Sequence, residues 1–254
     1  MRPRVAACLI AALAAGLAGC GLNGGNDDDG PRLRVAAAAS LKAAFEDIGR
    51  SAPGGRPSFS FAGSDQLAGQ IRAGARPDVF AAANAELPAQ LFREGLVERP
   101  VAFARNRLVI AVPAGAGGVR QVEDLGRTGR RLAIGAPGVP IGSYTRGVLG
   151  RLPPAIRRRI LANVRSEEPD VSGIVGKVAQ RAVSAGLVYA SDVTASRGRL
   201  DAVALPDDLQ PEVTYAVAVV RGVRSAARAR GFVALVTAAA GQRALRRAGL
   251  LGAP

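Results

Sequence analysis

The alternation of short apolar stretches with amphipathic stretches, which begins at residue 32, most constrains how this chain can fold. Arg32–Ala38 is apolar enough for a buried strand, and Leu41, Phe45 and Ile48 then repeat at helical spacing. Ser40 stands between the two, where serine is a favoured helix N-cap residue. A hydroxyl and free backbone N–H groups at the positive end of a helix form a ready anion site. An ordinary strand–helix turn has the same form, so a site is favoured only where the arrangement repeats.

The alternation continues to the C-terminus and predicts an α/β fold. Further strands are expected at Ser58–Ala62, Pro77–Ala81, Asn106–Val112, Arg131–Ile134, Gly186–Ala190, Ala202–Leu205 and Val213–Val220. Helices are expected from Gly63, over Ala85–Arg93 and Val122–Leu125, from Pro140 and Pro153, and over Ser172–Ala185, Ser225–Ala240 and Gln242–Gly249. The 254 residues suffice for two lobes of about 100 to 150 residues each. The long apolar strands Asn106–Val112 and Val213–Val220 are suited to crossing between them.

The N-terminus has the pattern of a targeting segment. Two arginines precede the apolar run Val5–Leu17, which is too short to span a bilayer comfortably. The following Leu17-Ala18-Gly19-Cys20 resembles a bacterial lipobox, which implies a signal peptide over 1–19 and lipid attachment to Cys20. Residues 20–31 then form a flexible tether rich in Gly, Asn and Asp. A plain secretory signal with an incidental cysteine is the alternative.

Charge and cysteine content limit the partners of the exported domain. The formal net charge is +14, but the arginines are scattered and aromatic residues make up only 4% of the chain, so nucleic-acid binding is not expected. A basic surface can still concentrate an anionic ligand. With 48% apolar residues and few aromatics, the core is expected to consist of Ala, Val, Leu and Ile. Besides Cys20 the chain contains only Cys8, in the leader, so the mature domain has no disulfide.

The absence of histidine excludes several kinds of catalytic site. Without histidine, a Ser–His–Asp triad and histidine metal ligation are impossible. Ser40 and Lys42 are two residues apart and do not share a helix face. The adjacent carboxylates Glu167–Glu168 and Asp207–Asp208 are typical of solvated turns. No phosphate-binding glycine motif follows a strand.

The turns that open helices repeat the arrangement around Ser40. They are Ala39-Ser40, Gly63-Ser64, Pro140-Ile141-Gly142 and Asp170-Val171. Each exposes N–H groups that have no partner within the helix. Hydrogen bonds to a charged group contribute about 1.5–3 kcal/mol each, so five to seven would hold a small dianion without an arginine.

Five segments, in this order, resemble the molybdate-binding proteins that serve ABC importers. They are Ala37–Leu41, Phe61–Leu67, Ala75–Ala81, Val139–Tyr144 and Gly186–Asp192. The resemblance extends from Arg32 to the C-terminus. It implies a type II periplasmic binding protein fold, in which each lobe is a mixed sheet flanked by helices and two crossing strands form the hinge. Lobe I would comprise 32–107 and 216–254, and lobe II would comprise 108–215.

The resemblance also implies the residues of the anion site. The hydroxyls of Ser40 and Ser64, the backbone N–H groups of Ile141 and Val171, and the phenol of Tyr189 would hold molybdenum as molybdate, and tungstate likewise. Ala39 could shape the pocket floor, and Asp78 is expected to be structural. No catalytic residue and no cofactor are implied. The implied partners are the oxyanion, a membrane permease and, through lipid on Cys20, the outer face of the cell membrane. The exported protein is expected to be a monomer. It would be periplasmic if no lipid is attached.

Asp65 departs from the pattern, since many relatives carry a small residue there. A carboxylate aimed into the pocket would repel a dianion, whereas one in the first helical turn that points outward is favoured by the helix dipole. A pocket of donors suits molybdate, tungstate and sulfate, which carry no proton at neutral pH. Asp65 could accept the proton of phosphate, so phosphate stays open.

Other functions also remain open at this stage. Within the same class, the ligand could be sulfate or another tetrahedral oxyanion. Outside it, the chain could be an exported hydrolase of phosphate esters that works without histidine. A surface interaction protein with a vestigial cleft is a third possibility, which the retained hydroxyls of Ser40, Ser64 and Tyr189 disfavour.

Overall fold

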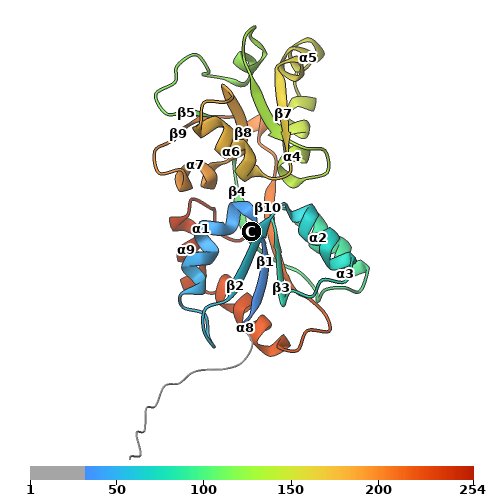
Figure 1. Cartoon of the computed structure of the whole chain (residues 1–254). Helices are drawn as coiled ribbons and strands as arrows, with labels where there is room; N and C mark the ends of the chain where they lie inside the picture. Colours follow the sequence, from blue (N-terminus) through green and yellow to red (C-terminus); the bar gives the residue numbers. More distant parts are fainter. Residues whose placement is uncertain (1–31) are drawn as a thin grey trace, which may run out of the picture.

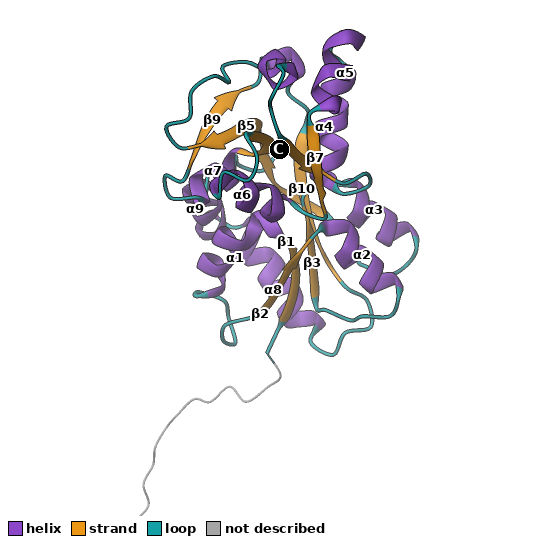
Figure 2. Ribbon diagram, turned by 45° about the horizontal axis from the view of Figure 1, so that its top comes forward, coloured by secondary structure: helices purple, strands orange, loops and turns teal. Residues whose placement is uncertain are grey.

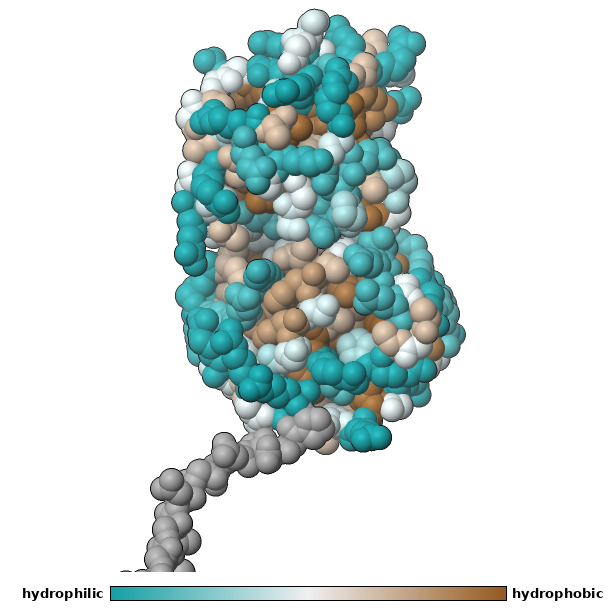
Figure 3. All heavy atoms as spheres, viewed as in Figure 1, coloured by the Kyte–Doolittle hydropathy of each residue, from teal (hydrophilic) through white to brown (hydrophobic). Residues whose placement is uncertain are grey.

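Two five-stranded sheets, each flanked by helices, divide the protein into two halves (Figure 1). The computed structural model describes residues 32–254. The predicted signal peptide, Cys20 and the tether lie outside the described residues. On the molecular surface the division is visible as a waist between the halves (Figure 3). No helix among the described residues combines the length and hydrophobicity needed to cross a bilayer.

The first half contains a mixed sheet with the strand order β2-β1-β3-β10-β4. Its strands are β1 (Arg34–Ala38), β2 (Ser58–Ala62), β3 (Val79–Ala82), β4 (Val101–Asn106) and β10 (Val213–Val219). Its helices are the 3₁₀ turn η1 (Ala39–Leu41), α1 (Lys42–Gly49), α2 (Ser64–Arg72), α3 (Glu86–Arg93), α8 (Ala226–Thr237) and α9 (Ala239–Arg247). Strand β1 pairs in parallel with β2 and β3, whereas β10 runs antiparallel to β3 and β4. The carboxyl ends of β1, β2 and β3 therefore share one edge of the sheet.

The second half repeats this plan with the strand order β7-β6-β8-β5-β9. Its strands are β5 (Leu108–Pro113), β6 (Leu132–Gly135), β7 (Val164–Glu168), β8 (Ala185–Tyr189) and β9 (Leu200–Ala204). Its helices are η2 (Val122–Gly126), α4 (Pro140–Gly150), α5 (Pro154–Ala162), α6 (Val171–Ala179), α7 (Ala190–Ala195) and η3 (Asp207–Leu209). Strand β6 is parallel to β7 and β8, and β5 is antiparallel to β8 and β9. Helices thus lie on both sides of each sheet (Figure 2).

The chain passes between the halves at Arg107. The predicted crossing strand over Asn106–Val112 is divided there, with β4 in the first sheet and β5 in the second. The N–H of Arg107 donates to the side chain of Asn106, while its carbonyl accepts from the N–H of Ala190 in the second half. The return passage lies between β9 and β10, and β10 belongs to the first sheet from Val213 onward.

The α/β class and the mixed sheets agree with the sequence-based prediction, but four elements were missed, the short 3₁₀ helix η3 among them, and one predicted helix was too long. Strand β4, strand β7 and helix α7 had no predicted counterpart. Strand β7 consists of Val-Arg-Ser-Glu-Glu and lies at the sheet edge, so its composition gives no signal of a buried strand. The predicted helix Ser172–Ala185 ends at Ala179, because β8 begins at Ala185.

The core is mostly aliphatic but contains buried aromatic side chains, which the composition did not predict. Phe45 on α1 packs against Phe59, Phe103 and Phe232, with ring centroids 5.7–6.3 Å apart. These contacts join α1 to β2, β4 and α8 in the first half. With Phe61, which stacks on Phe59, five of the seven phenylalanines belong to this cluster, and alanine, valine and leucine fill most of the remaining core.

Candidate functional site

A small cavity lies where the two sheets face each other with the carboxyl ends of their parallel strands. Ligands bind at this edge of open α/β sheets because the loops and helix starts converge there. The cavity is lined by Ala38, Ala39, Ser40, Ala62, Gly63, Ser64, Ala83, Val139, Pro140, Ile141, Asp170, Val171 and Tyr189. It measures about 20 Å³. One water molecule requires roughly 10–15 Å³, so the cavity fits only a small occupant. All five residues expected from the sequence line it.

Ser40 reaches the cavity from a 3₁₀ turn and is not the helix N-cap that the sequence predicted. The turn spans Ala39–Leu41, its N-cap is Ala38, and α1 begins only at Lys42. The Ser40 hydroxyl instead forms a hydrogen bond with the hydroxyl of Tyr215 on β10, at 3.0 Å. This bond fixes the Ser40 side chain against the first sheet.

Ser64 is the first residue of α2 and is 2% exposed. Its N-cap is Gly63, which has no side chain to cover the first turn. The Ser64 Oγ accepts the N–H of Ala83 at 3.0 Å. Because that bond uses an oxygen lone pair, the proton of Ser64 remains available to a second acceptor.

Ile141 and Val171 present backbone groups from the first turns of α4 and α6. The first N–H groups of a helix have no acceptor within it, and they lie at the positive end of the helix dipole. In α6 the Asp170 carboxylate caps Ser172 N and Gly173 N, at 2.7 and 3.4 Å. The cap leaves the N–H of Val171 available at the cavity wall.

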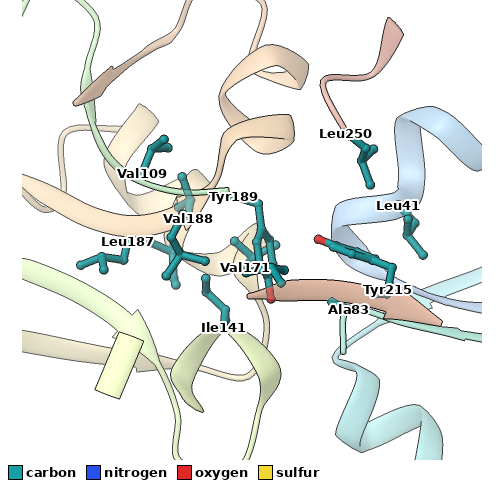
Figure 4. Close-up of a cluster of buried hydrophobic side chains, with 14 of the residues drawn as sticks. Leu41, Ala83, Val109, Ile141, Val171, Leu187, Val188, Tyr189, Tyr215 and Leu250 are labelled. Carbon is teal, nitrogen blue, oxygen red and sulfur yellow. The ribbon is translucent and has the colours of Figure 1, made fainter. Parts of the chain in front are cut away.

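Tyr189 brings a buried phenol that has no hydrogen-bond partner. Its side chain is 1% exposed, and its hydroxyl oxygen is among the buried atoms without a partner in the described structure. The ring lies beside Val171 and Ile141 (Figure 4) and packs edge-on against Tyr215 and Tyr144, at 5.8 and 6.4 Å. Burial raises the pKa of Tyr189 well above its ordinary value, so the phenol keeps its proton and is a donor.

The cavity attracts negative charge through neutral dipoles. No arginine or lysine belongs to the cavity-lining residues of the described chain. The single carboxylate in the lining, Asp170, is directed to the N-terminus of α6 by its capping bonds. The arrangement can therefore bind a small anion through hydroxyl and amide donors. It contains no nucleophile–base pair for catalysis.

Asp65 and Asp78 stand apart from the cavity lining. Asp65 is the second residue of α2, and its Oδ1 is buried without a partner in the described structure. A Cβ placed on Gly63 would lie 2.9 Å from this oxygen. Asp78 accepts the backbone N–H of Arg34 at 2.7 Å and ties the start of β1 to β3. The expectation that Asp78 is structural is thus confirmed. Asp65 is half-buried rather than directed freely into solvent.

The two halves touch beside the cavity. A Cβ placed on Gly63 would lie 2.5 Å from the backbone oxygen of Pro169, which precedes α6 in the second half. Only glycine permits this approach, although its φ of −59° is accessible to any residue. The structure therefore represents a closed cleft.

Sequence reasoning did not identify several wall residues or the partner of Ser40. Ala62 ends one predicted strand and Ala83 lies just after another, so the rule that ligands meet the carboxyl ends of parallel strands could have indicated both residues. Tyr215 lies in the middle of a predicted apolar strand, and only the three-dimensional contact with Ser40 reveals its role.

Asp192 is a buried carboxyl group directly behind the cavity. It is 8% exposed, and its Oδ2 accepts the N–H of Tyr189 at 3.0 Å. Burial raises the pKa of Asp192 to about 7, the Tyr189 N–H opposes this shift, and the charge of Asp170 adds to it. The folded protein thus retains a proton that the unfolded chain releases near pH 4.

Comparisons with known proteins agree with this geometry. The family model described as Bacterial extracellular solute-binding protein matches residues 33–251. The chain is 39% identical over 251 residues to the molybdate-binding protein ModA of Mycobacterium tuberculosis, covering 94% of each chain. It is 31% identical over 211 residues to ModA of Escherichia coli, covering 78% of this chain and 80% of the relative.

Two solved structures share the fold. The periplasmic molybdate-binding protein of Azotobacter vinelandii superposes with a TM-score of 0.78 at 19% identity, covering 87% of this chain and 99% of that one. The sulfate-binding protein SubI of Mycobacterium tuberculosis superposes with a TM-score of 0.77 at 15% identity, covering 86% of each.

Asp192 predicts a specific pH dependence of stability. Between about pH 4 and pH 7 the folded state binds more protons than the unfolded state, so the free energy of unfolding falls as pH rises. The contribution is on the order of a few kcal/mol, at ~1.4 kcal/mol per pKa unit. In urea titrations at pH 5 and pH 8, Asp192→Asn should flatten this difference while keeping an acceptor for Tyr189 N. The control Asp208→Asn, on an exposed turn, should retain the wild-type difference. Equal behaviour of the two variants would contradict the assignment.

Proposed function

Because the chain belongs to the family of bacterial extracellular solute-binding proteins, we propose that it binds molybdate between its two halves and delivers it to an ABC importer. The observation that carries the proposal is the unpartnered phenol of Tyr189 in a cavity lined by hydroxyls and helix starts. A buried donor without an acceptor costs about 1–3 kcal/mol. An oxyanion in the cavity supplies the acceptor.

The five proposed contacts are Ser40, Ser64, Ile141, Val171 and Tyr189. Each of the five offers a proton. The single carboxylate in the cavity lining, Asp170, is occupied as the cap of α6. A dianion without a proton, such as molybdate, tungstate or sulfate, finds a donor for its oxygens. Hydrogen phosphate would place its own O–H against another donor. The name of the 39% identical relative favours molybdate within this group.

We propose that the halves act as lobes that close on the anion. The segment around Arg107 and the return between β9 and β10 serve as the hinge. Lobe II corresponds to the predicted range 108–215 without Val213–Tyr215, which pair in strand β10 of the first sheet. An anion that contacts Ser40 and Ser64 from one lobe and Ile141, Val171 and Tyr189 from the other favours the closed state. The lobes then present a closed surface to the permease.

Attachment to the membrane is a further part of the proposal. Cys20 would carry lipid, and residues 21–31 would tether a monomeric binding domain to the outer face of the cell membrane. The lipobox-like Leu17-Ala18-Gly19-Cys20 supports this arrangement. Metabolic labelling with a fatty acid, with Cys20→Ser as control, tests it directly.

Titration calorimetry on protein that starts after Cys20 tests the ligand. Molybdate and tungstate should bind tightly at one site, and sulfate and phosphate far more weakly. Tyr189→Phe should weaken molybdate binding about 10- to 100-fold, because it removes one hydrogen bond to a charged acceptor. Thr237→Val removes an exposed hydroxyl that bonds only within α8, and this variant should bind like wild type. Tightest binding of sulfate or phosphate would reassign the ligand, and folded protein that binds no oxyanion would refute the site.

Closure can be tested without removing any donor. Gly63→Ala places a Cβ 2.5 Å from the Pro169 carbonyl and should hold the cleft open, which we expect to weaken molybdate binding about 10-fold. Gly69→Ala on the same helix meets no atom within 4 Å and should leave the affinity unchanged. Small-angle scattering with and without molybdate should show less compaction for Gly63→Ala. Unaltered affinity in that variant would mean that the anion binds without this contact.

A further inference from the structure

Tyr215 lies behind the candidate anion site and does not line the cavity. It belongs to β10 in the first half and is fully buried. Its hydroxyl is directed toward the second half, with Tyr189 across from it (Figure 4). Two hydrogen bonds hold the oxygen, one with Ser40 Oγ at 3.0 Å and one with Asn106 Nδ2 at 3.3 Å.

The hydrogen bonds of Asn106 establish which group donates and which accepts at the Tyr215 hydroxyl. Asn106 Oδ1 accepts the N–H of Arg107 at 2.9 Å, so the opposite end of the amide is the Nδ2 donor. That group donates to Ser191 Oγ at 2.8 Å and to the Tyr215 hydroxyl oxygen. Tyr215 therefore accepts from Asn106, and its own proton requires an acceptor.

Ser40 is the acceptor that the structure offers to the Tyr215 proton. Burial raises the pKa of Tyr215 well above its ordinary value, with the charge of Asp192 adding to the shift, so the phenol stays protonated. If Ser40 donated to Tyr215 instead, the phenol proton would be buried without a partner, at a cost of about 1–3 kcal/mol. Every buried proton has an acceptor when Asn106 donates to Tyr215 and Tyr215 donates to Ser40. This arrangement leaves the Ser40 proton for the cavity.

We propose that Tyr215 is a positioning residue that makes Ser40 an obligate donor to the bound anion and thereby helps to exclude anions that carry a proton. This inference rests on the proposed oxyanion function and deepens it. Ser64 is set in the same way, because its oxygen already accepts the N–H of Ala83. In both serines an internal donor leaves the hydroxyl proton for the cavity, where the O–H of a protonated ligand such as hydrogen phosphate would face another donor.

The substitution Tyr215→Phe tests this role because it removes only the hydroxyl. The Ser40 hydroxyl can then rotate its proton away from the cavity and present a lone pair to a protonated anion. Molybdate affinity, measured by calorimetry, should fall about 3- to 10-fold, the size expected for one neutral hydrogen bond. Phosphate affinity should stay constant or rise, so the molybdate-to-phosphate ratio narrows. A purely structural role would weaken both anions alike and leave the ratio unchanged.

A double-mutant cycle tests whether Tyr215 acts through Ser40. Ser40→Ala and Ser40→Ala/Tyr215→Phe should bind molybdate equally, because Tyr215 has no Ser40 hydroxyl left to orient. Additive losses would overturn the proposal. Thr237→Val, which removes a hydroxyl bonded only within α8, is the control, and its molybdate-to-phosphate affinity ratio should equal that of the wild type.

Asn106→Ala provides a second route if Tyr215→Phe does not fold. It removes the donor that directs the Tyr215 proton toward Ser40. The molybdate-to-phosphate affinity ratio should therefore fall, as in Tyr215→Phe, but by a smaller factor. An unchanged ratio in folded Asn106→Ala would count against the proposal. If wild-type protein binds no molybdate, the proposed function fails first, whereas wild-type binding with an unchanged ratio in the variants rejects this inference alone.

Discussion

The buried phenol of Tyr189 needs an acceptor that the protein itself does not provide among its described residues. Its oxygen has no partner, its ring is enclosed by Val171, Tyr144 and Tyr215, and its proton is retained because burial opposes ionisation. A donor in this position is costly unless something enters the cavity to accept its proton. We therefore propose that closure of the two halves and occupation of the cavity by an anion depend on each other.

The way in which the cavity attracts charge suits a ligand that must later be released. Helix starts and hydroxyls form a set of neutral donors, and the arginines lie elsewhere on the surface. A lysine or arginine in contact with the anion would add an attraction that remains when the cleft opens. Dipoles that converge only in the closed state lose most of their effect when the halves separate. The positive net charge of +14 still raises the local concentration of anions around the molecule.

The sequence predicted the parts of this arrangement that depend on local pattern. Strand–helix alternation identified β1, β2 and β6 and the turns that follow them, and an ordered set of short motifs indicated Ser40, Ser64, Ile141, Val171 and Tyr189, which line one cavity. Contacts between distant segments could not be predicted in this way. The bond from Tyr215 to Ser40 joins residues 175 positions apart, and the polar edge strand β7 has no hydrophobic pattern. The prediction that Ser40 caps a helix was wrong, because its hydroxyl bonds to the distant Tyr215 and not to the backbone of its own helix.

The measurement that tests the central claim most directly is a crystal structure of the domain grown with tungstate, in which anomalous scattering locates the metal. The account predicts one tungsten peak in the cavity, with the oxyanion oxygens within hydrogen-bond distance of the Ser40, Ser64 and Tyr189 hydroxyls and the N–H groups of Ile141 and Val171. No lysine or arginine should contact it. Tungsten found only beside surface arginines, with the phenol of Tyr189 still without an acceptor, would contradict the account.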